Sequence, residues 1–208
     1  IQTARPDVEK SNVLRSSGPI MSSKSPAILW FRQDLRIIDN PALSAAVASG
    51  RPIVPIYILD EETPDIRAHG GASRWWLHQS LESLRADLRA KGLTLVLRKG
   101  SARHVIADVV SQSGAHAVYW NRCYEPWAMH RDEKIKARLQ ARAIAVESYN
   151  GALLWEPWTV KKNNGDPYKV FTPFYRQGCL QSEVPRQPVP IPQATLYHHD
   201  TESTLSID

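Results

Sequence analysis

Two arginines and two aspartates directly follow a short apolar run near residue 30. The apolar sequence AILWF is succeeded by RQDLRIIDN (32–40), which contains Arg32, Asp34, Arg36 and Asp39. An arginine presents a planar, permanently charged set of N–H donors, and an aspartate can orient that set or accept hydrogen bonds from a ligand ring. This combination predicts a polar ligand site, or alternatively an Arg–Asp network that only holds the loop together.

Aromatic side chains gather in a second segment, WNRCYEPW, which ends at Trp127. It combines Trp120, Tyr124 and Trp127 with the charged Arg122 and Glu125. Aromatic faces beside a few polar groups suit a flat, conjugated ring system. The alternative is that Trp120 belongs to the core and that the other two rings cover an edge of the fold.

Other motifs of known chemistry are missing or incomplete. No G-x-G-x-x-G follows the first apolar run and no G-x-x-x-x-G-K-[ST] occurs, so a dinucleotide site of that type or a P-loop is not expected. The HRD sequence (130–132) lacks the other kinase motifs and is interpreted as a helix start. His198 and His199 lack a third metal ligand, and Ser101 is expected to cap a helix rather than to act as a nucleophile.

The elements that must position these residues alternate between strands and helices. Near-continuous apolar runs predict the strands, while apolar spacing, the N-cap Asn40 with Pro41, and stop glycines predict the helices. The expected strands are 27–31, 52–59, 94–98, 117–120 and 143–149, and the expected helices are 41–49, 72–91, 101–113 and 129–142.

This alternation predicts an α/β fold. We expect a doubly wound, five-stranded parallel sheet of strand order 3-2-1-4-5, with helices on both faces. Ligands of such sheets bind outside the carboxyl ends of the strands, where the strand order reverses. That point lies between the first and fourth strands, so loops 32–40 and 121–128 are expected to form the two walls of a crevice.

Composition divides the chain of 208 residues into a folded domain and two tails. Residues 1–26 are polar and lack periodicity, and are expected to be a disordered tail or an extension ahead of a natural start at Met21. Residues 27–180 form the α/β domain. Residues 181–208 are rich in proline and are interpreted as an extended linker.

The charge and cysteine content restrict the class of protein. Lys and Arg total 26 against 21 Asp and Glu, a net charge of +5 that is compatible with a nucleic-acid partner without indicating one. No apolar run approaches the roughly 20 residues that cross a bilayer, and no signal peptide is recognisable. With two isolated cysteines, Cys123 and Cys179, these features predict a cytoplasmic protein with no membrane partner and no metal site.

Four segments, in order along the chain, resemble the DNA photolyase/cryptochrome family. They are LWFRQDLRIIDNPAL from residue 29, GGASRWWLHQSLESLRADLRAKGLTLVLRKG (70–100), VYWNRCYEP (118–126) and PYKVFTPFYRQ (167–177). The resemblance covers about residues 26–208 and is greatest to class I cyclobutane pyrimidine dimer photolyases. It implies a two-domain flavoprotein whose N-terminal α/β domain carries a light-harvesting antenna chromophore.

The resemblance further implies that a C-terminal helical domain, which this sequence lacks, binds FAD and damaged DNA. Excitation energy passes from the antenna to FAD, which splits a pyrimidine dimer flipped out of the duplex. We therefore expect this chain to be the antenna-binding half of a light-dependent DNA repair lyase, with weak or no DNA binding and no repair by itself. The alternatives are the N-terminal domain of a cryptochrome photoreceptor without repair activity, and a cofactor-binding module that works alone.

The resemblance also suggests which residues hold the antenna chromophore. A folate, a deazaflavin and FMN all stay open as its identity. Folate-binding members often carry an Asn–Glu pair where this sequence has Trp127 and Ala128, and Trp127 filling the crevice itself is a further alternative. The expected binding residues are Arg32, Asp34, Leu35 and Arg36 in the first loop, Asp60 after the second strand, Lys99, Gly100 and Ser101 after the third, and Arg122, Tyr124 and Glu125 after the fourth.

The segment PYKVFTPFYRQ has a separate predicted role. Alternation of Tyr168, Val170 and Phe171 predicts a final strand, and Phe174 and Tyr175 are expected to begin a helix. In the family this region packs near the second domain. In the present chain we expect these aromatic side chains to be partly exposed, which would allow self-association through the interdomain face.

Overall fold

The computed structural model describes residues 24–192. The predicted N-terminal tail as far as residue 23, Met21 included, and the predicted linker beyond residue 192, with His198 and His199, lie outside the described residues. Within the described range, no helix is both long and apolar enough to cross a membrane.

Five parallel strands form a single sheet. They are β1 (Ala27–Phe31), β2 (Ile53–Leu59), β3 (Val96–Lys99), β4 (Ala117–Asn121) and β5 (Ala145–Tyr149), and their order is β3-β2-β1-β4-β5. β1 lies at the centre, where Ala27 pairs with Ile53 on one side and with Ala117 on the other. The predicted fold class and strand order are therefore confirmed.

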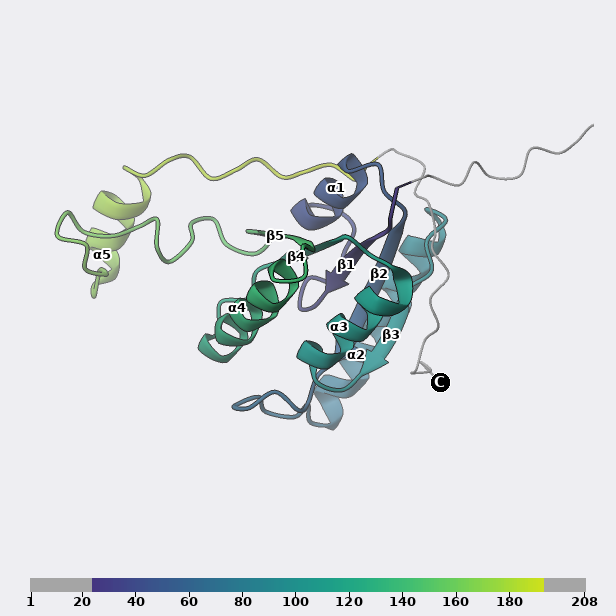
Figure 1. The fold of residues 1–208 in the computed structure, drawn as a ribbon. Coiled ribbons are helices and arrows are strands. Elements are labelled where there is room, and N and C mark those ends of the chain that lie inside the picture. The colour runs from purple at the N-terminus through teal and green to yellow at the C-terminus, as the bar shows by residue number, and fades with distance from the viewer. Residues whose placement is uncertain (1–23, 193–208) are drawn as a thin grey trace, which may run out of the picture.

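Helices cover both faces of this sheet, as predicted (Figure 1). α1 (Pro41–Ala48) and α2 (Gly71–Arg89) pack on one face through residues such as Leu43 and Leu84. α3 (Ala102–Ser113) and α4 (Pro126–Gln140) pack on the other through residues such as Ile106 and Ile135. Successive β1 residues alternate between the two hydrophobic clusters because side chains of a strand point to opposite faces.

The helix starts explain how the loops around the carboxyl ends of the strands are fixed. Asn40 caps α1 as predicted, since its side chain accepts a hydrogen bond of 3.0 Å from the Leu43 N–H. Ser101 stands at the N-cap position of α3, but its side chain makes no capping bond. The carboxylates of Asp60 and Glu62 take that role, accepting from the N–H groups of Ala102 and Ser101 at 3.1 Å each. α4 begins at Pro126, earlier than predicted.

The predicted final strand through Tyr168, Val170 and Phe171 is wrong. This segment has no strand partner, and Phe171 begins a short helix, α5 (Phe171–Pro173), which continues as the π-helical η1 (Phe174–Cys179). Figure 1 shows α5 set apart from the sheet, beyond reach of an edge strand that could pair with it. Apolar alternation stabilises a strand only where a neighbouring backbone supplies the hydrogen bonds.

Candidate functional site

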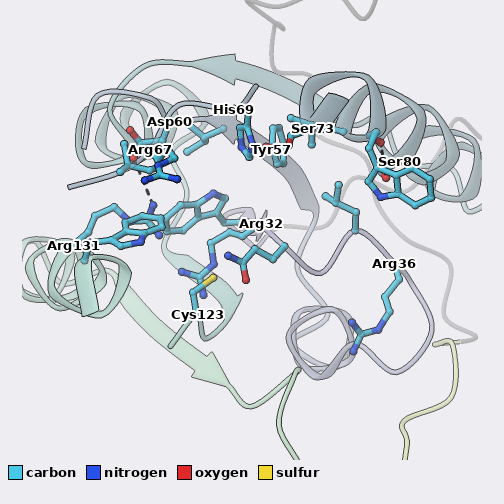
Figure 2. Close-up of a pocket in the computed structure, with 18 of the residues that line it drawn as sticks. Arg32, Arg36, Tyr57, Asp60, Arg67, His69, Ser73, Ser80, Cys123 and Arg131 are labelled. Carbon is cyan, nitrogen blue, oxygen red and sulfur yellow. Dashed lines mark hydrogen bonds and ion pairs between the residues drawn. The ribbon is translucent and has the colours of Figure 1, made fainter. Parts of the chain in front are cut away.

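A cavity of about 950 Å³ lies at the carboxyl ends of β1 and β2 and beside the loop that follows β4. The point where the strand order reverses, between β1 and β4, is therefore part of it, as predicted. The opposite wall was not predicted and comes from the loop after β2 and from the first half of α2 (Figure 2). We call this cavity the pocket.

The floor of the pocket is built from an indole and two guanidinium groups. Trp30, Arg32 and Arg131 are only 2%, 8% and 9% exposed. The guanidinium carbons of Arg32 and Arg131 each lie 4.9 Å from the centroid of the Trp30 ring, and that of Arg131 also lies 5.0 Å from the ring of Trp127. These cation–π contacts hold the aromatic rings in fixed orientations.

Two buried aspartates neutralise the arginines of the floor. Asp132 pairs with Arg32 and, at 2.9 Å, with Arg131, while Asp60 lies 3.5 Å from Arg131. Burial acts to raise the pKa of Asp60, but hydrogen bonds from Thr63 and from the Ala102 N–H outweigh burial and lower it. The carboxylate is therefore ionised at neutral pH and ties β2, α3 and α4 together beneath the pocket.

Three N–H donors of the floor lack a hydrogen-bond partner within residues 24–192. They are Nε and Nη2 of Arg32 and Nε1 of Trp30, and all three are buried. An unpaired buried donor costs about 1–3 kcal/mol, so proteins seldom leave several together without a use. These donors have no exposed surface, so they can meet acceptor atoms at the edge of a ligand ring only when the side chains turn towards the cavity. An isoalloxazine, a deazaflavin or a pterin ring carries such acceptor atoms.

The walls of the pocket add aromatic surface and further positive charge. Trp127 is half-buried and forms part of one wall, so it leaves the cavity open rather than filling it. Trp76 of α2 is 69% exposed, and Arg67 and His69 of the loop after β2 also line the pocket. Burial, with a smaller effect of Glu61, raises the pKa of Tyr57 to about 12, so this residue presents a neutral phenol.

The residues of the first loop divide between the pocket and its support. Arg32, Leu35 and Arg36 line the pocket, but Figure 2 shows Arg36 well apart from Arg32. Arg36 donates its hydrogen bonds to the backbone carbonyl groups of Ile38, Asp39 and Gly151. Asp34 accepts from the Arg32 N–H at 2.9 Å and from Asn121 Nδ2 at 2.5 Å, and so fixes the loop without lining the pocket.

Of the other predicted residues, only Asp60 lines the pocket. Arg122 and Tyr124 both bind Glu156, at 2.6 and 2.7 Å, and attach the segment after β5. Glu125 accepts a hydrogen bond of 2.7 Å from Gln33. The remaining three lie around the end of β3 and the start of α3, outside the pocket lining: Lys99, Gly100 and Ser101.

Several lining residues were not predicted. Those in residues 66–80 belong to the loop after β2 and to the start of α2. A parallel sheet of order 3-2-1-4-5 places the loop after β2 beside the crevice, so the topology could have indicated these residues as part of its lining. Arg131 belongs to the HRD sequence, which was interpreted only as a helix start; it lies inside α4 and reaches the floor. The missed lining residues include Trp30, Tyr57, Arg67, His69, Trp76 and Arg131, whereas Cys123 and Trp127 belong to the loop that was predicted as a wall.

Comparison with known proteins gives consistent results. The family model for DNA photolyase matches residues 27–193. A deoxyribodipyrimidine photo-lyase of Agrobacterium fabrum is 42% identical over 171 residues, which make up 81% of this chain and 35% of that protein. Cryptochrome-1 of Arabidopsis thaliana is 39% identical over 155 residues, 74% of this chain and 22% of that protein.

A solved structure shares the fold. The crystal structure of a bacterial class III photolyase from Agrobacterium tumefaciens matches with a TM-score of 0.81 and 37% identity, over 92% of this chain and 39% of that one. Because that protein is a class III photolyase, the greater resemblance to class I photolyases stays a prediction. The chain spans well under half the length of these relatives. It belongs to the DNA photolyase family.

Proposed function

We propose that this chain is the antenna-chromophore-binding domain of a deoxyribodipyrimidine photolyase, a light-dependent enzyme that splits pyrimidine dimers in DNA. The observation that carries the proposal is the pocket floor, where Arg32 and Trp30 keep unpaired donors beneath a cavity large enough for a fused ring system. Family membership supplies the rest of the argument: the relatives of this chain include a photolyase at 42% identity, and the pocket lies where doubly wound sheets bind ligands.

The pocket residues bind and orient a ring and do no bond chemistry. Trp30 and Trp127 offer aromatic faces, Arg32 offers N–H donors to one edge of the ring, and the ion pairs with Asp60 and Asp132 keep these groups rigid. When bound, the chromophore would absorb light and pass its excitation to FAD, which we place outside this chain. A fixed ring orientation and the exclusion of water are what such a transfer requires of the protein.

The floor favours a chromophore class and not one compound. Acceptor-rich rings of a folate, a deazaflavin or FMN all suit the donors of Arg32 and Trp30. Trp127 and Ala128 stand where folate-binding members often carry Asn and Glu, which disfavours that mode of folate binding.

Titration of this chain with each of the three pigments tests the proposal. We expect one pigment to bind with a shifted absorption band, and we expect Arg32→Met to raise its dissociation constant at least tenfold, because a charged N–H donor pair is lost. Lys99→Gln is the matched control, since Lys99 is exposed and lies outside the pocket lining. Circular dichroism checks that Arg32→Met is folded, and Arg32→Lys, which keeps the charge, is the second variant. Failure of all three pigments to bind the unaltered chain would overturn the proposal.

A cryptochrome-type photoreceptor is the second candidate, supported by the similarity to a plant cryptochrome. The two functions share the same kind of antenna domain and differ in whether the whole protein repairs DNA. Illumination of the whole protein with DNA that contains thymine dimers separates them, because only a photolyase restores the dimers to thymines.

Damaged DNA is the partner that we propose for the whole protein, and little or no DNA binding is proposed for this chain alone. We also propose that the chain self-associates through an aromatic face, which we define as Val170, Phe171, Phe174, Tyr175 and Leu180, all of them exposed. Such a patch of large apolar side chains is uncommon on a free surface and favours association.

A further inference from the structure

The described part of the predicted linker, residues 181–192, follows η1 and returns to loop 32–40. We call these residues the linker. Figure 1 shows it running from α5 back to α1. There Arg186 Nη1 donates to Asp39 Oδ1 at 2.6 Å, the Val189 N–H donates to the same oxygen at 3.1 Å, and the Asp39 N–H donates to the Val189 carbonyl oxygen at 3.0 Å. Ile191 then packs against the core on the α1 face. Asp39 is therefore held by the linker from two sides.

Asp39 is a position where the backbone requires such support. Its φ is +46°, in the left-handed region that residues other than glycine seldom adopt, although Asp and Asn tolerate it best. The hydrogen bond from Arg186 is the largest cause of a lowered pKa of Asp39, so the carboxylate is ionised at neutral pH. The linker contacts thus stabilise an unfavourable conformation directly before the N-cap of α1.

The same loop carries the pocket residues Arg32, Leu35 and Arg36. Arg36 donates to the carbonyl oxygens of Asp39, at 3.0 Å, and Gly151, at 2.6 Å. Arg186 donates through Nε to the Asn150 carbonyl oxygen at 3.1 Å. Loop 32–40, residues 150–151 and the linker therefore form one hydrogen-bonded unit.

The inner side of the loop is held separately. Asn121 Nδ2 donates to Asp34 Oδ2 and to Asn40 Oδ1, and Asn40 Nδ2 donates to the Arg36 carbonyl oxygen. These bonds anchor the loop to β4 but do not reach Asp39, whose carboxylate contacts only Arg36, at 3.7 Å, besides the linker within the described residues. Removal of the linker contacts should accordingly loosen the outer part of the loop while the sheet stays intact.

We infer that Arg186 and Val189 are positioning residues of the pocket: by clamping Asp39, the linker holds loop 32–40 in the conformation that binds the ligand. The identity of the ligand rests on the proposed function. The clamp rests only on the hydrogen bonds described above. Because coupling between two sites is reciprocal, a ligand in the pocket must strengthen docking of the linker by the same factor by which the docked linker strengthens ligand binding. The pocket would thereby influence the placement of whatever follows the linker.

Hydrogen exchange on the ligand-free chain tests the clamp by itself. We expect Arg186→Gln to speed exchange of the Asp39 and Val189 amides at least tenfold, with amides of β1 and β4 unchanged, because the Asp39 carboxylate loses its nearest charged partner and keeps only the longer ion pair with Arg36. Arg186→Lys should restore part of the protection. Arg176→Gln, an exposed arginine on η1, is the control. Unchanged exchange at Asp39 and Val189 in Arg186→Gln would overturn the clamp.

Binding of FMN as a probe tests the coupling. We expect Arg186→Gln to raise the dissociation constant of FMN several-fold, Arg186→Lys to restore it, and saturating FMN to slow exchange of the Val189 amide in the unaltered chain. Equal FMN affinity in the unaltered chain and Arg186→Gln would overturn the coupling and leave the pocket assignment standing. If neither FMN nor the other two pigments bind the unaltered chain, the proposed function and the coupling fail together, and the exchange experiment still decides the clamp.

Discussion

At the scale of single residues, Asp60 connects the pocket floor with the start of α3. Its carboxylate accepts hydrogen bonds from the hydroxyl of Thr63, at 2.5 Å, and from the backbone N–H groups of Glu62, Thr63 and Ala102. It also faces Arg131 at 3.5 Å. A carboxylate with this many donors is held in its charged form, and its loss would leave a buried arginine short of a partner.

Asp60→Asn should destabilise the chain by about 3–5 kcal/mol, the usual cost of removing one partner of a buried ion pair. The folded-state pKa of Asp60 is lowered, so its contribution to stability is present above the ordinary carboxyl pKa of about 4 and is lost as pH falls through the lower folded value. Urea unfolding between pH 2 and 7 should therefore show a smaller acid-induced loss in Asp60→Asn than in the unaltered chain. Glu62→Gln is the control, because Glu62 is an exposed carboxylate that accepts a hydrogen bond at the start of the same helix, α3. Equal pH dependence in the two variants would contradict the assignment.

Gly151 is a second residue whose identity the packing determines. A Cβ there would lie 2.5 Å from Asn121 Cγ, and Asn121 cannot move because it is buried and hydrogen-bonded to Asn40 and to the Ala42 N–H. We expect Gly151→Ala to lower the free energy of unfolding by about 1–3 kcal/mol through overpacking. Gly71→Ala is the matched control, because a Cβ at Gly71 meets nothing within 4 Å. Chemical denaturation measures both, and an unchanged midpoint for Gly151→Ala would refute the close contact.

At the scale of elements, the strands and their order were predictable because buried parallel strands are continuously apolar and the connections have one hand. The site was predictable only in part. Arg32 and Asp60 directly follow strands, so topology places them, whereas Arg131 reaches the floor through a helix whose inward face no local pattern reveals. The loop 60–70 has no periodicity, and the rotation of Tyr124 towards Glu156 depends on a segment more than 30 residues away. Such choices are set by tertiary packing.

The segment after β5 illustrates an element fixed by one carboxylate. Glu156 accepts from Arg122 and Tyr124, and the pKa of Tyr124 is raised to about 12, first by burial and then by the hydrogen bond to Glu156. An unfolded tyrosine ionises near pH 10, so the folded chain holds more protons between about pH 10 and 12 and loses stability as pH rises there.

Glu156→Gln should therefore lower the pKa of Tyr124 and reduce the fall in stability over that pH range. The reason is that two causes of the raised pKa, the carboxylate charge and its hydrogen bond, are removed while burial persists. The tyrosine Cζ resonance of Tyr124 reports its ionisation directly. Glu133→Gln, at an exposed glutamate of α4, should leave the resonance unaffected. A titration of Tyr124 that is the same in both variants would show that Glu156 does not control it.

At the scale of the whole molecule, the carboxyl edge of the sheet carries the pocket, and the segments beyond β5 support one pocket loop and carry the aromatic face. The pocket is lined by the loops of β1, β2 and β4 and by α2, and Arg186 and Val189 contact the first of these loops. The helical turn that carries the aromatic face lies apart from the sheet (Figure 1). Phe171 and Tyr175 stack there at 5.9 Å with their ring planes 3° apart, and Phe171 is 72% exposed.

This face should drive self-association of the chain, and Phe171→Ser should weaken it. Burial of a phenylalanine side chain contributes about 1.5–3 kcal/mol, so the dimer dissociation constant should rise roughly tenfold or more for a side chain that contributes in each of two copies. Sedimentation equilibrium over a range of concentrations measures the constant. Met129→Ser removes an exposed apolar side chain from α4 instead and should leave association unchanged. If the unaltered chain stays monomeric at all concentrations, or if Met129→Ser weakens association as much as Phe171→Ser does, the aromatic face is not the contact surface.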